Sequence, residues 1–184
     1  MKTRTFLWRR LDAPGFDFCR LEAGSRLRLG GSAIFAHHGR PCLLSYKVAC
    51  DSRGRTRRAE VEGWIGSKRV ALLIVADAVR RWRINGRECT RVAGCDDVDL
   101  NFTPSTNTLP LRRLEFPTGR AIGVRAAWLR FPDLTLHPLD QAYRRISRTR
   151  FRYETPGGFS ILLDVDGAGF VTRYGNQWRA AATL

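Results

Sequence analysis

The chain has 184 residues, 43% hydrophobic and 27% charged, and this composition excludes an intrinsically disordered protein. Its length predicts one domain, residues 1–184, with a core of its own. The formal net charge is +15, and arginine supplies 29 of the 32 basic residues. Such a charge predicts attraction to anionic surfaces such as nucleic acid, acidic lipid headgroups or phosphorylated glycans.

The N-terminal stretch MKTRTFLWRRLDAPGFDF lacks the apolar segment of a signal peptide. The longest apolar run, Val70–Ala76, is too short to cross a bilayer. These features predict a cytoplasmic protein without a transmembrane segment. The five cysteines are odd in number and form no CxxC motif, so we expect no disulfide framework.

The first third of the chain alternates apolar and polar residues, which is typical of antiparallel strands with one face in the core. Thr5–Leu11 and Phe16–Leu21 are predicted strands around a turn at residues 12–15, and Arg26–Phe35 is the next. Within it, Gly30-Gly31 indicates a bulge or a close approach of another group to the backbone.

The same pattern continues through Leu43–Asp51 and Ala59–Ile65. Val70–Ala76 is apolar on both faces, and we therefore place it centrally in the sheet. Asn85-Gly86 predicts a hairpin with a type I′ turn, which needs positive φ at both central residues.

Further strands follow in the last third of the chain. They are expected at Ala121–Phe131, Arg150–Glu154, Phe159–Val165 and Phe170–Tyr174. Asp140–Ile146 is the one predicted helical piece. Roughly a dozen short strands at hairpin spacing, with at most one or two short helices, predict an all-β, mainly antiparallel domain.

The stretch from Gly94 to Phe116 contains the densest run of special residues. Its prolines cannot donate backbone hydrogen bonds, so they exclude a central strand. We predict a strand tip, then an ordered connector, then Arg112 and Arg113 entering the next strand. Asp97 or Asp99 could pair with either arginine as an internal clasp, and a ligand site is the alternative reading of the same residues.

The sequence predicts no metal site, no cofactor and no enzyme. His37 and His38 are adjacent, so on a strand they would point to opposite faces. Asp164–Gly167 resembles the start of a calcium loop but lacks the remaining ligands. The chain contains no GxSxG, Walker or Rossmann motif, and no set of nucleophile, base and orienting group is evident.

Four motifs carry a resemblance to a known family: DVDLNFTPSTNTLPLRRL, AAWLRFPDLTLHPLDQAY, FRYE and LDVDGAGFVTRY. In this order they resemble the bacterial "putative glycolipid-binding" proteins, formerly a domain of unknown function, over nearly the whole chain. The resemblance implies a fold similar to bacterial lipid and lipoprotein carriers, a spiral β-roll or open half-barrel around an apolar cavity. It also implies non-enzymatic binding of an amphipathic ligand, a glycolipid or lipid, in the concave face.

Such a ligand needs aromatic faces for sugar rings, an apolar groove for its chains and arginine forks for phosphate or carboxylate. The residues of the family motifs that we predict as ligand contacts are Asn107, Arg112, Arg113, Trp128, Arg130, Tyr143 and Tyr153. Adjacent strand residues face opposite sides, so only one of Arg112 and Arg113 is expected to face the concavity.

Two alternatives stay open. The net charge and the arginine-rich turns at Arg53–Arg58 and Arg144–Arg152 are compatible with a nucleic-acid-associated protein, although no recognised nucleic-acid motif supports it. The third interpretation is a protein–protein interaction domain whose concavity is filled by its own side chains. The oligomeric state is left open by the sequence.

Overall fold

A computed structural model describes residues 2–184, which form one large β-sheet and very little helix. The strands are β1 (Lys2–Arg10), β2 (Gly15–Ala23), β3 (Leu27–His37), β4 (Arg40–Cys50), β5 (Thr56–Ile65), β6 (Lys68–Ala76), β7 (Trp82–Ile84), β8 (Arg87–Glu88), β9 (Asp97–Asp99), β10 (Ala121–Arg130), β11 (Thr135–Ser147), β12 (Arg150–Glu154), β13 (Ser160–Val165), β14 (Val171–Tyr174) and β15 (Trp178–Thr183). The helical pieces are the 3-10 turns η1 (Thr90–Val92) and η2 (Ser105–Asn107) and the α-helix α1 (Thr108–Arg113). The all-β prediction is confirmed.

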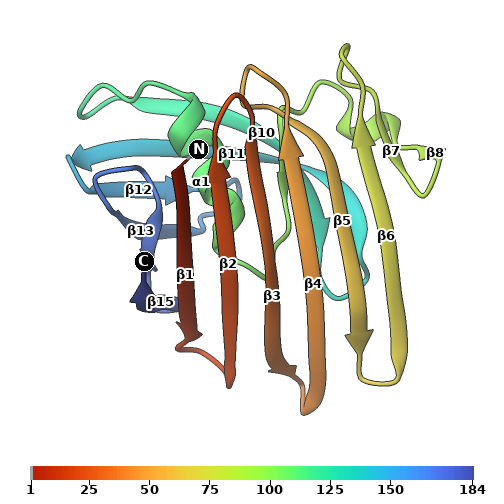
Figure 1. Ribbon diagram of the computed structural model, residues 1–184. Helices are drawn as coiled ribbons and strands as arrows, with labels where there is room; N and C mark the ends of the chain where they lie inside the picture. The colour runs from red at the N-terminus through yellow and green to blue at the C-terminus, as the bar shows by residue number, and fades with distance from the viewer. Residues whose placement is uncertain (1) are drawn as a thin grey trace.

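The 15 strands form a single sheet in the order β8-β7-β6-β5-β4-β3-β2-β1-β15-β14-β13-β12-β11-β10-β9. All neighbouring pairs are antiparallel except β9 and β10, which run parallel. The chain's last strand, β15, pairs with β1, so the N-terminal and C-terminal strands join the two halves of the sheet. Figure 1 shows β1–β6 side by side with β10–β13 behind them.

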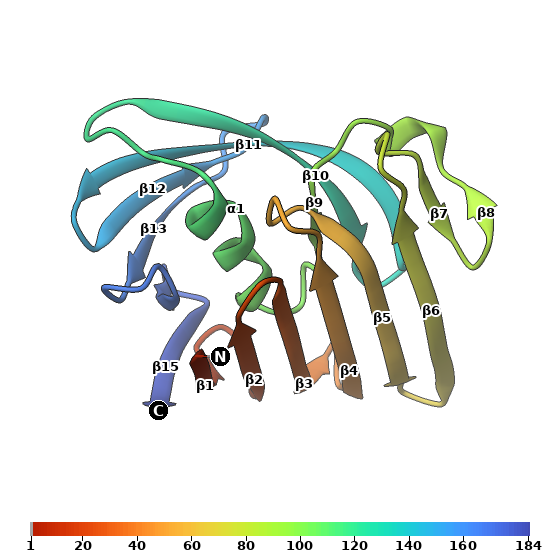
Figure 2. The ribbon, with the colours of Figure 1, turned by 45° about the horizontal axis from the view of Figure 1, so that its top comes forward.

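The sheet rolls over on itself without closing, because β8 and β9 at its two ends do not pair. Figure 2 shows β10–β13 lying above β1–β6, with α1 between the two layers. We call the side of the sheet that faces α1 the inner face and the opposite side the outer face. The expectation of an open, rolled sheet is therefore confirmed.

Alternation along each strand assigns its side chains to these two faces. In β4, the inner residues Leu44, Tyr46 and Val48 are buried, whereas Leu43, Ser45 and Lys47 are exposed on the outer face. Burying one face of every long strand is what holds such a sheet in a single register.

Gly31 marks a close approach rather than a bulge, since β3 keeps continuous register with both neighbours. A Cβ atom at Gly31 would lie 2.5 Å from the Tyr46 hydroxyl and 2.3 Å from the Phe18 carbonyl oxygen. Glycine is therefore required where the Tyr46 ring crosses beneath β3.

The segment between β9 and β10 occupies the inner face. Residues 102–111, including η2 and most of α1, are all buried. Around them lie two hydrophobic clusters. The larger joins β1–β7 to β9 and the far end of β10, and the smaller joins Leu111 and Phe116 to β10–β14.

Three predictions about individual elements were wrong. Asp140–Ile146 lies in β11, not in a helix, because Gln141 and Tyr143 alternate inward between less buried neighbours. Arg112 and Arg113 end α1 rather than entering a strand; Pro110 is tolerated there because the first-turn N–H groups of a helix need no intrahelical partner. β6, predicted to be central, lies third from the end of the sheet.

Candidate functional site

An interior cavity of about 300 Å³ lies on the inner face between the η2 segment and strands β10–β14. Three of the predicted ligand contacts, Asn107, Trp128 and Tyr153, line it together with Asp99. The other lining residues are Asn101, Thr103, Pro104, Leu139, Thr155, Phe159, Tyr174, Gln177 and Trp178. We call this space the interior cavity.

The parallel pairing of β9 with β10 creates one wall. It sets Asp99 directly beside Trp128, and Asp97 beside Ala126. Asp99 then accepts two hydrogen bonds, from the Asn101 backbone N–H at 2.8 Å and from the Gln141 side-chain amide at 2.7 Å. The carboxylate is thereby fixed at the cavity wall.

A hydrogen-bond network extends from Asp99 through β11 to η2. The Tyr143 hydroxyl donates to the Asn107 side-chain oxygen at 2.9 Å and lies 3.2 Å from the side-chain oxygen of Gln141. Tyr143 is fully buried, and it therefore supports Asn107 from behind instead of lining the cavity.

Aromatic rings form the opposite wall. Tyr153 lies at the centre of this group, with ring centroids 5.1 Å from Tyr143, 6.0 Å from Tyr174 and 6.1 Å from Phe159. Trp178, opposite Arg10 in the sheet, closes the group and has the Arg10 guanidinium 5.2 Å from its ring centroid.

Burial controls the protonation of the cavity's ionisable groups. It raises the pKa of Asp99, against the lowering effect of the hydrogen bonds from Asn101 and Gln141. Burial also raises the pKa of Tyr153 and of Tyr174 above the ordinary tyrosine value. Both hydroxyls therefore keep their protons at neutral pH and can donate hydrogen bonds to a ligand.

A second buried carboxyl lies behind the cavity wall. Thr103, which lines the cavity, donates to Asp17, and the Tyr46 hydroxyl lies 3.1 Å and 3.2 Å from its two oxygens. Asp17 is fully buried, and within residues 2–184 no cation lies within 4.0 Å of it. Burial accordingly raises its pKa to about 7.

The three predicted arginines lie outside the cavity. Arg113 pairs with Asp97, which is one of the pairings the sequence left open, and its other amino group is 3.6 Å from Asp96. Arg112 donates to the Ala168 carbonyl, with its guanidinium 5.0 Å from the Phe170 ring centroid. Arg130 pairs with Asp133 in the β10–β11 turn. A ligand-binding role for these arginines stays a prediction.

The predicted clasp therefore involves only one of its two candidate acids. Asp97 is buried beside Arg113, whereas Asp99 bonds to Gln141 and belongs to the cavity. Despite its cation, Asp97 has a pKa raised to about 6, because burial outweighs the guanidinium.

The inner strand face expected to line an empty concavity is largely covered. Ile122 and Val124 pack with Leu111 and Phe116 in the smaller hydrophobic cluster, and only Trp128 of that face lines the cavity. Self-filling, the feature of the third interpretation, thus applies to the part of the concavity that residues 102–111 and the smaller hydrophobic cluster occupy, and the interior cavity stays open beside it.

Sequence reasoning missed the cavity residues Phe159, Gln177 and Trp178. They lie in the β12–β13 connection and at the β14–β15 turn, and the roll of the sheet brings them to Asn107 and Trp128. Phe159 was predicted only as the start of a strand, and no local pattern at the three positions indicates a ligand contact, so the sequence offered no signal.

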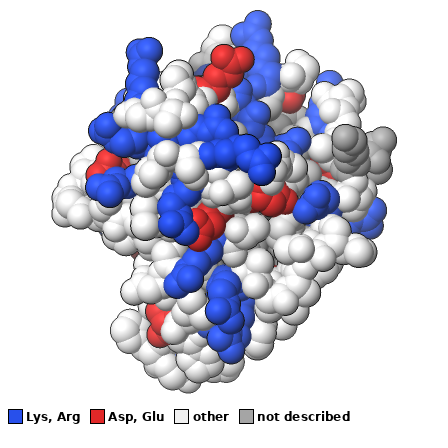
Figure 3. Space-filling view, turned by 90° about the vertical axis from the view of Figure 1, so that its left-hand side faces the viewer, with Lys and Arg blue, Asp and Glu red and all other residues white. Residues whose placement is uncertain are grey.

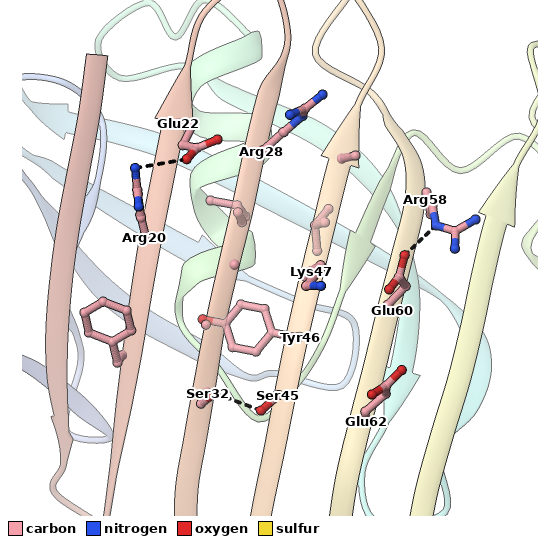
Figure 4. Close-up of a pocket in the computed structure, with 16 residues that line it drawn as sticks. Arg20, Glu22, Arg28, Ser32, Ser45, Tyr46, Lys47, Arg58, Glu60 and Glu62 are labelled. Carbon is pink, nitrogen blue, oxygen red and sulfur yellow. Dashed lines mark hydrogen bonds and ion pairs between the residues drawn. The ribbon is translucent and has the colours of Figure 1, made fainter. Parts of the chain in front are cut away.

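A larger hollow of about 620 Å³ lies on the outer face of β2–β5, and we call it the outer groove. Its floor is made of small residues on β3 and β4, among them Gly30, Ser32 and Ser45. Figure 4 shows the charged side chains along its two sides, with Arg20 paired to Glu22 and Arg58 to Glu60. Apart from Phe18 its rim is mainly charged, unlike the aromatic wall of the cavity.

Within residues 2–184 no group of three or more His, Cys, Asp or Glu side chains is placed to hold a metal ion. None of the helices described has the length and hydropathy needed to cross a membrane.

A rolled, open β-sheet with a cavity on its inner face is the class of protein that this geometry defines. The chain belongs to the family described as "Putative glycolipid-binding", whose sequence model matches residues 5–180. The family's description supports a binding role in general. No curated protein matched the sequence.

A solved structure supports the fold independently. The chain is similar to a DUF1089 family protein from Pseudomonas aeruginosa, whose crystal structure was determined at 1.80 Å resolution. The two are 26% identical with a TM-score of 0.77, over 86% of this chain and 88% of that one.

Proposed function

We propose that the chain binds an amphipathic glycolipid without transforming it, holding a sugar of the headgroup in the interior cavity. One observation carries this proposal: a wall of aromatic rings faces a wall of fixed polar groups across a space of about 300 Å³. Aromatic faces suit the C–H faces of sugar rings, and the amides of Asn101, Asn107 and Gln177 suit hydroxyl groups.

The size of the cavity limits what it can hold. Small-molecule sites span about 300–1,000 Å³, so this cavity is at the lower end of the range and suits a sugar unit better than a complete lipid. The apolar chains of the ligand would leave through the mouth. Phe159 lines the cavity yet is 41% exposed, and Asn101 is also exposed, so we place the mouth between them.

The polar groups of the cavity favour binding over turnover. Both oxygens of Asp99 already accept hydrogen bonds, from Asn101 and Gln141, so the carboxylate is held as an orienting acceptor. No cofactor enters the proposal. The cytoplasmic location stays a prediction.

The test is a calorimetric titration with n-octyl β-D-glucopyranoside below its micelle-forming concentration, with n-octanol as the ligand lacking a sugar. We expect saturable binding of the glucoside and much weaker binding of the alcohol. Trp128→Ala and Phe159→Ser should each weaken glucoside binding by about tenfold, equivalent to roughly 1.4 kcal/mol.

Both side chains are partly exposed, so their loss should leave the fold intact, which thermal melting would verify. The matched control is Phe18→Ala, which removes the aromatic ring of the outer groove. Unchanged affinity in both cavity variants would overturn the proposal. A loss confined to Phe18→Ala would place the ligand in the outer groove instead.

A further inference from the structure

Four large apolar side chains form a row on the outer face of β2–β5. Phe16 is 48% exposed, Ile34 60%, Leu43 41% and Trp64 48%. The register sets Phe16 opposite Ile34, Ile34 opposite Leu43 and Leu43 opposite Trp64, so the row is continuous across four neighbouring strands. At a strand spacing of about 4.8 Å the row is about 14 Å long. We call these four residues the apolar row.

Cations continue the same line at both ends. Arg9 is opposite Phe16, Arg179 is opposite Arg9, and Arg69 is opposite Trp64. All three arginines are exposed. Within residues 2–184 no carboxylate lies within 4.0 Å of their guanidinium groups, although many other arginines of the chain are paired.

The carboxylates of this face lie elsewhere. Glu22, Glu60 and Glu62 border the outer groove, and two of them are held by neighbouring arginines (Figure 4). Apart from Glu62, which is exposed two residues before Trp64, the charge that stays available for an external partner beside the apolar row is therefore positive.

We propose that the apolar row and its flanking arginines form a docking surface for an anionic lipid bilayer. Peripheral proteins bind such bilayers by inserting apolar side chains at the interface while cations meet the acidic headgroups. A contiguous exposed apolar row is unusual on a monomer and marks an interaction surface, which accounts for Ile34 and Leu43 as well as for the aromatic residues.

Two other occupants fit this surface less well than an anionic bilayer. A second copy of this chain, related by a twofold axis, would bring the same arginines against each other without carboxylates between them. A nucleic acid would use the arginines and the aromatic rings, but it offers nothing that favours the aliphatic side chains of Ile34 and Leu43.

The docking surface is at the same end of the sheet as part of the cavity wall. Trp178 lines the cavity and is opposite Arg10, at the end of β1 where Arg9 flanks the row. The backbone of Gln177, also a cavity residue, accepts a hydrogen bond from the Leu11 N–H at 2.8 Å. A bilayer bound at the row would thus be close to the cavity residues at this end.

The experiment is flotation with vesicles of phosphatidylcholine containing phosphatidylglycerol, compared with vesicles of phosphatidylcholine alone. The vesicles contain no glycolipid, so the result does not depend on the proposed function. We expect the wild type to bind only the anionic vesicles. Ile34→Ser/Trp64→Ser and Arg9→Glu/Arg69→Glu should each weaken binding by about tenfold or more.

Matched controls separate a local surface from the general charge of the molecule. Arg87→Glu/Arg152→Glu changes the net charge equally on exposed residues of β8 and β12, and Val79→Ser removes a 72% exposed apolar side chain elsewhere. Both should keep wild-type binding within about twofold. Trp64→Phe should still bind, but it should lose the blue shift of tryptophan emission caused by vesicles.

Three results would overturn the proposal. The first is an equal loss of vesicle binding in Arg9→Glu/Arg69→Glu and Arg87→Glu/Arg152→Glu. The second is an Ile34→Ser/Trp64→Ser variant that binds vesicles as well as the wild type does. The third is a wild type that does not bind anionic vesicles. Sedimentation of the protein alone gives a further check. If the wild type is a dimer and the Ile34→Ser/Trp64→Ser variant is a monomer, a second copy of the chain occupies the apolar row.

Discussion

Asp97 and Asp17 are both buried carboxyl groups, but their partners differ. Asp97 faces the guanidinium of Arg113, whereas the partners of Asp17 within residues 2–184 are the hydroxyls of Thr103 and Tyr46. Burial raises the pKa of Asp97 to about 6 and that of Asp17 to about 7. The difference allows the contribution of each carboxyl group to be tested separately.

Removing the cation beside Asp97 should destabilise the fold. Arg113→Leu leaves a buried, unpaired carboxylate, and we expect the free energy of unfolding to fall by about 3–5 kcal/mol at pH 8. The loss should be smaller at pH 5, where Asp97 can take up a proton. Urea unfolding at the two pH values measures both effects.

Arg112→Leu is the control, since the Arg112 side chain is exposed and contacts the Ala168 carbonyl and the Phe170 ring but, within residues 2–184, no carboxylate. It should change stability by about 0.5 kcal/mol or less. If the two variants unfold at the same urea concentration, the Asp97–Arg113 pair does not stabilise the fold as we infer.

Asp17 should make stability depend on pH near neutrality. Its folded-state pKa of about 7 exceeds the ordinary value of 3.8, so the native state binds the proton more tightly than the unfolded chain. Its contribution to stability is therefore present at low pH and is lost as the pH rises from about 4 to about 7. We expect this loss in the free energy of unfolding to be on the order of 2–4 kcal/mol, and Asp17→Asn should abolish it.

The measurement is the free energy of unfolding of both proteins from pH 4 to pH 8. The difference between the two curves isolates Asp17 from the other titrating groups. Parallel curves would show that the Asp17 carboxyl titrates alike in the folded and unfolded chains.

At the scale of residues, the sequence predicts the kinds of side chain in the site better than their contacts. Asn107, Trp128 and Tyr153 were assigned to the site through the family resemblance, and they line one cavity. The contact between Asp17 and Thr103 spans 86 positions, and no spacing rule connects such a pair.

Within β3, the two neighbouring glycines should respond oppositely to the same substitution. Gly31→Ala would press a Cβ atom against Tyr46 and the Phe18 backbone, and we expect a loss of about 1–3 kcal/mol in the free energy of unfolding. Gly30→Ala has its nearest neighbour at 3.9 Å, the Tyr46 carbonyl oxygen. It should be neutral or stabilising by about 0.4–1 kcal/mol.

The melting temperatures of Gly31→Ala and Gly30→Ala test this prediction. Equal melting temperatures would mean that the Tyr46 ring does not cross beneath β3 as described. A larger loss in Gly30→Ala would reverse the assignment of the two glycines to the inner and outer faces.

Elements whose conformation is set by the residue types at one or two neighbouring positions were predictable from the sequence. The Asn85-Gly86 hairpin forms as expected, with φ of 48° and 80° at the two residues. β11 was not recognised as a strand because its inner face includes the polar Gln141, which hides the apolar alternation. α1 was not predicted because the prolines of this stretch were used only to exclude a central strand, although prolines are compatible with a first helical turn.

At the scale of the whole molecule, the roll of the sheet could not be derived from periodicity. Alternation fixes which residues face inward, but it does not say that β15 pairs with β1 or that β9 ends the sheet beside β10. The expectation of a roll came from the family resemblance. The cavity depends on that roll, since its walls come from β9–β12, β14, the start of β15, η2 and the connections between these elements.

The positive charge is also a property of the whole surface. Figure 3 shows many Lys and Arg side chains over the side of the molecule where β1, β12, β13 and β15 lie, with several acidic residues between them. Such a surface attracts polyanions without selecting one, and the association of the chain with nucleic acid stays a prediction. Any such binding should weaken steeply with salt and should be unaffected by Trp128→Ala.

The most direct test of glycolipid binding is native mass spectrometry of the protein purified without detergent. We predict a retained mass that fragments into a sugar and an apolar remainder, present in the wild type and in Phe18→Ala and lost in Trp128→Ala. A wild-type spectrum without any retained ligand, or a ligand retained equally by Trp128→Ala, would contradict binding in the interior cavity.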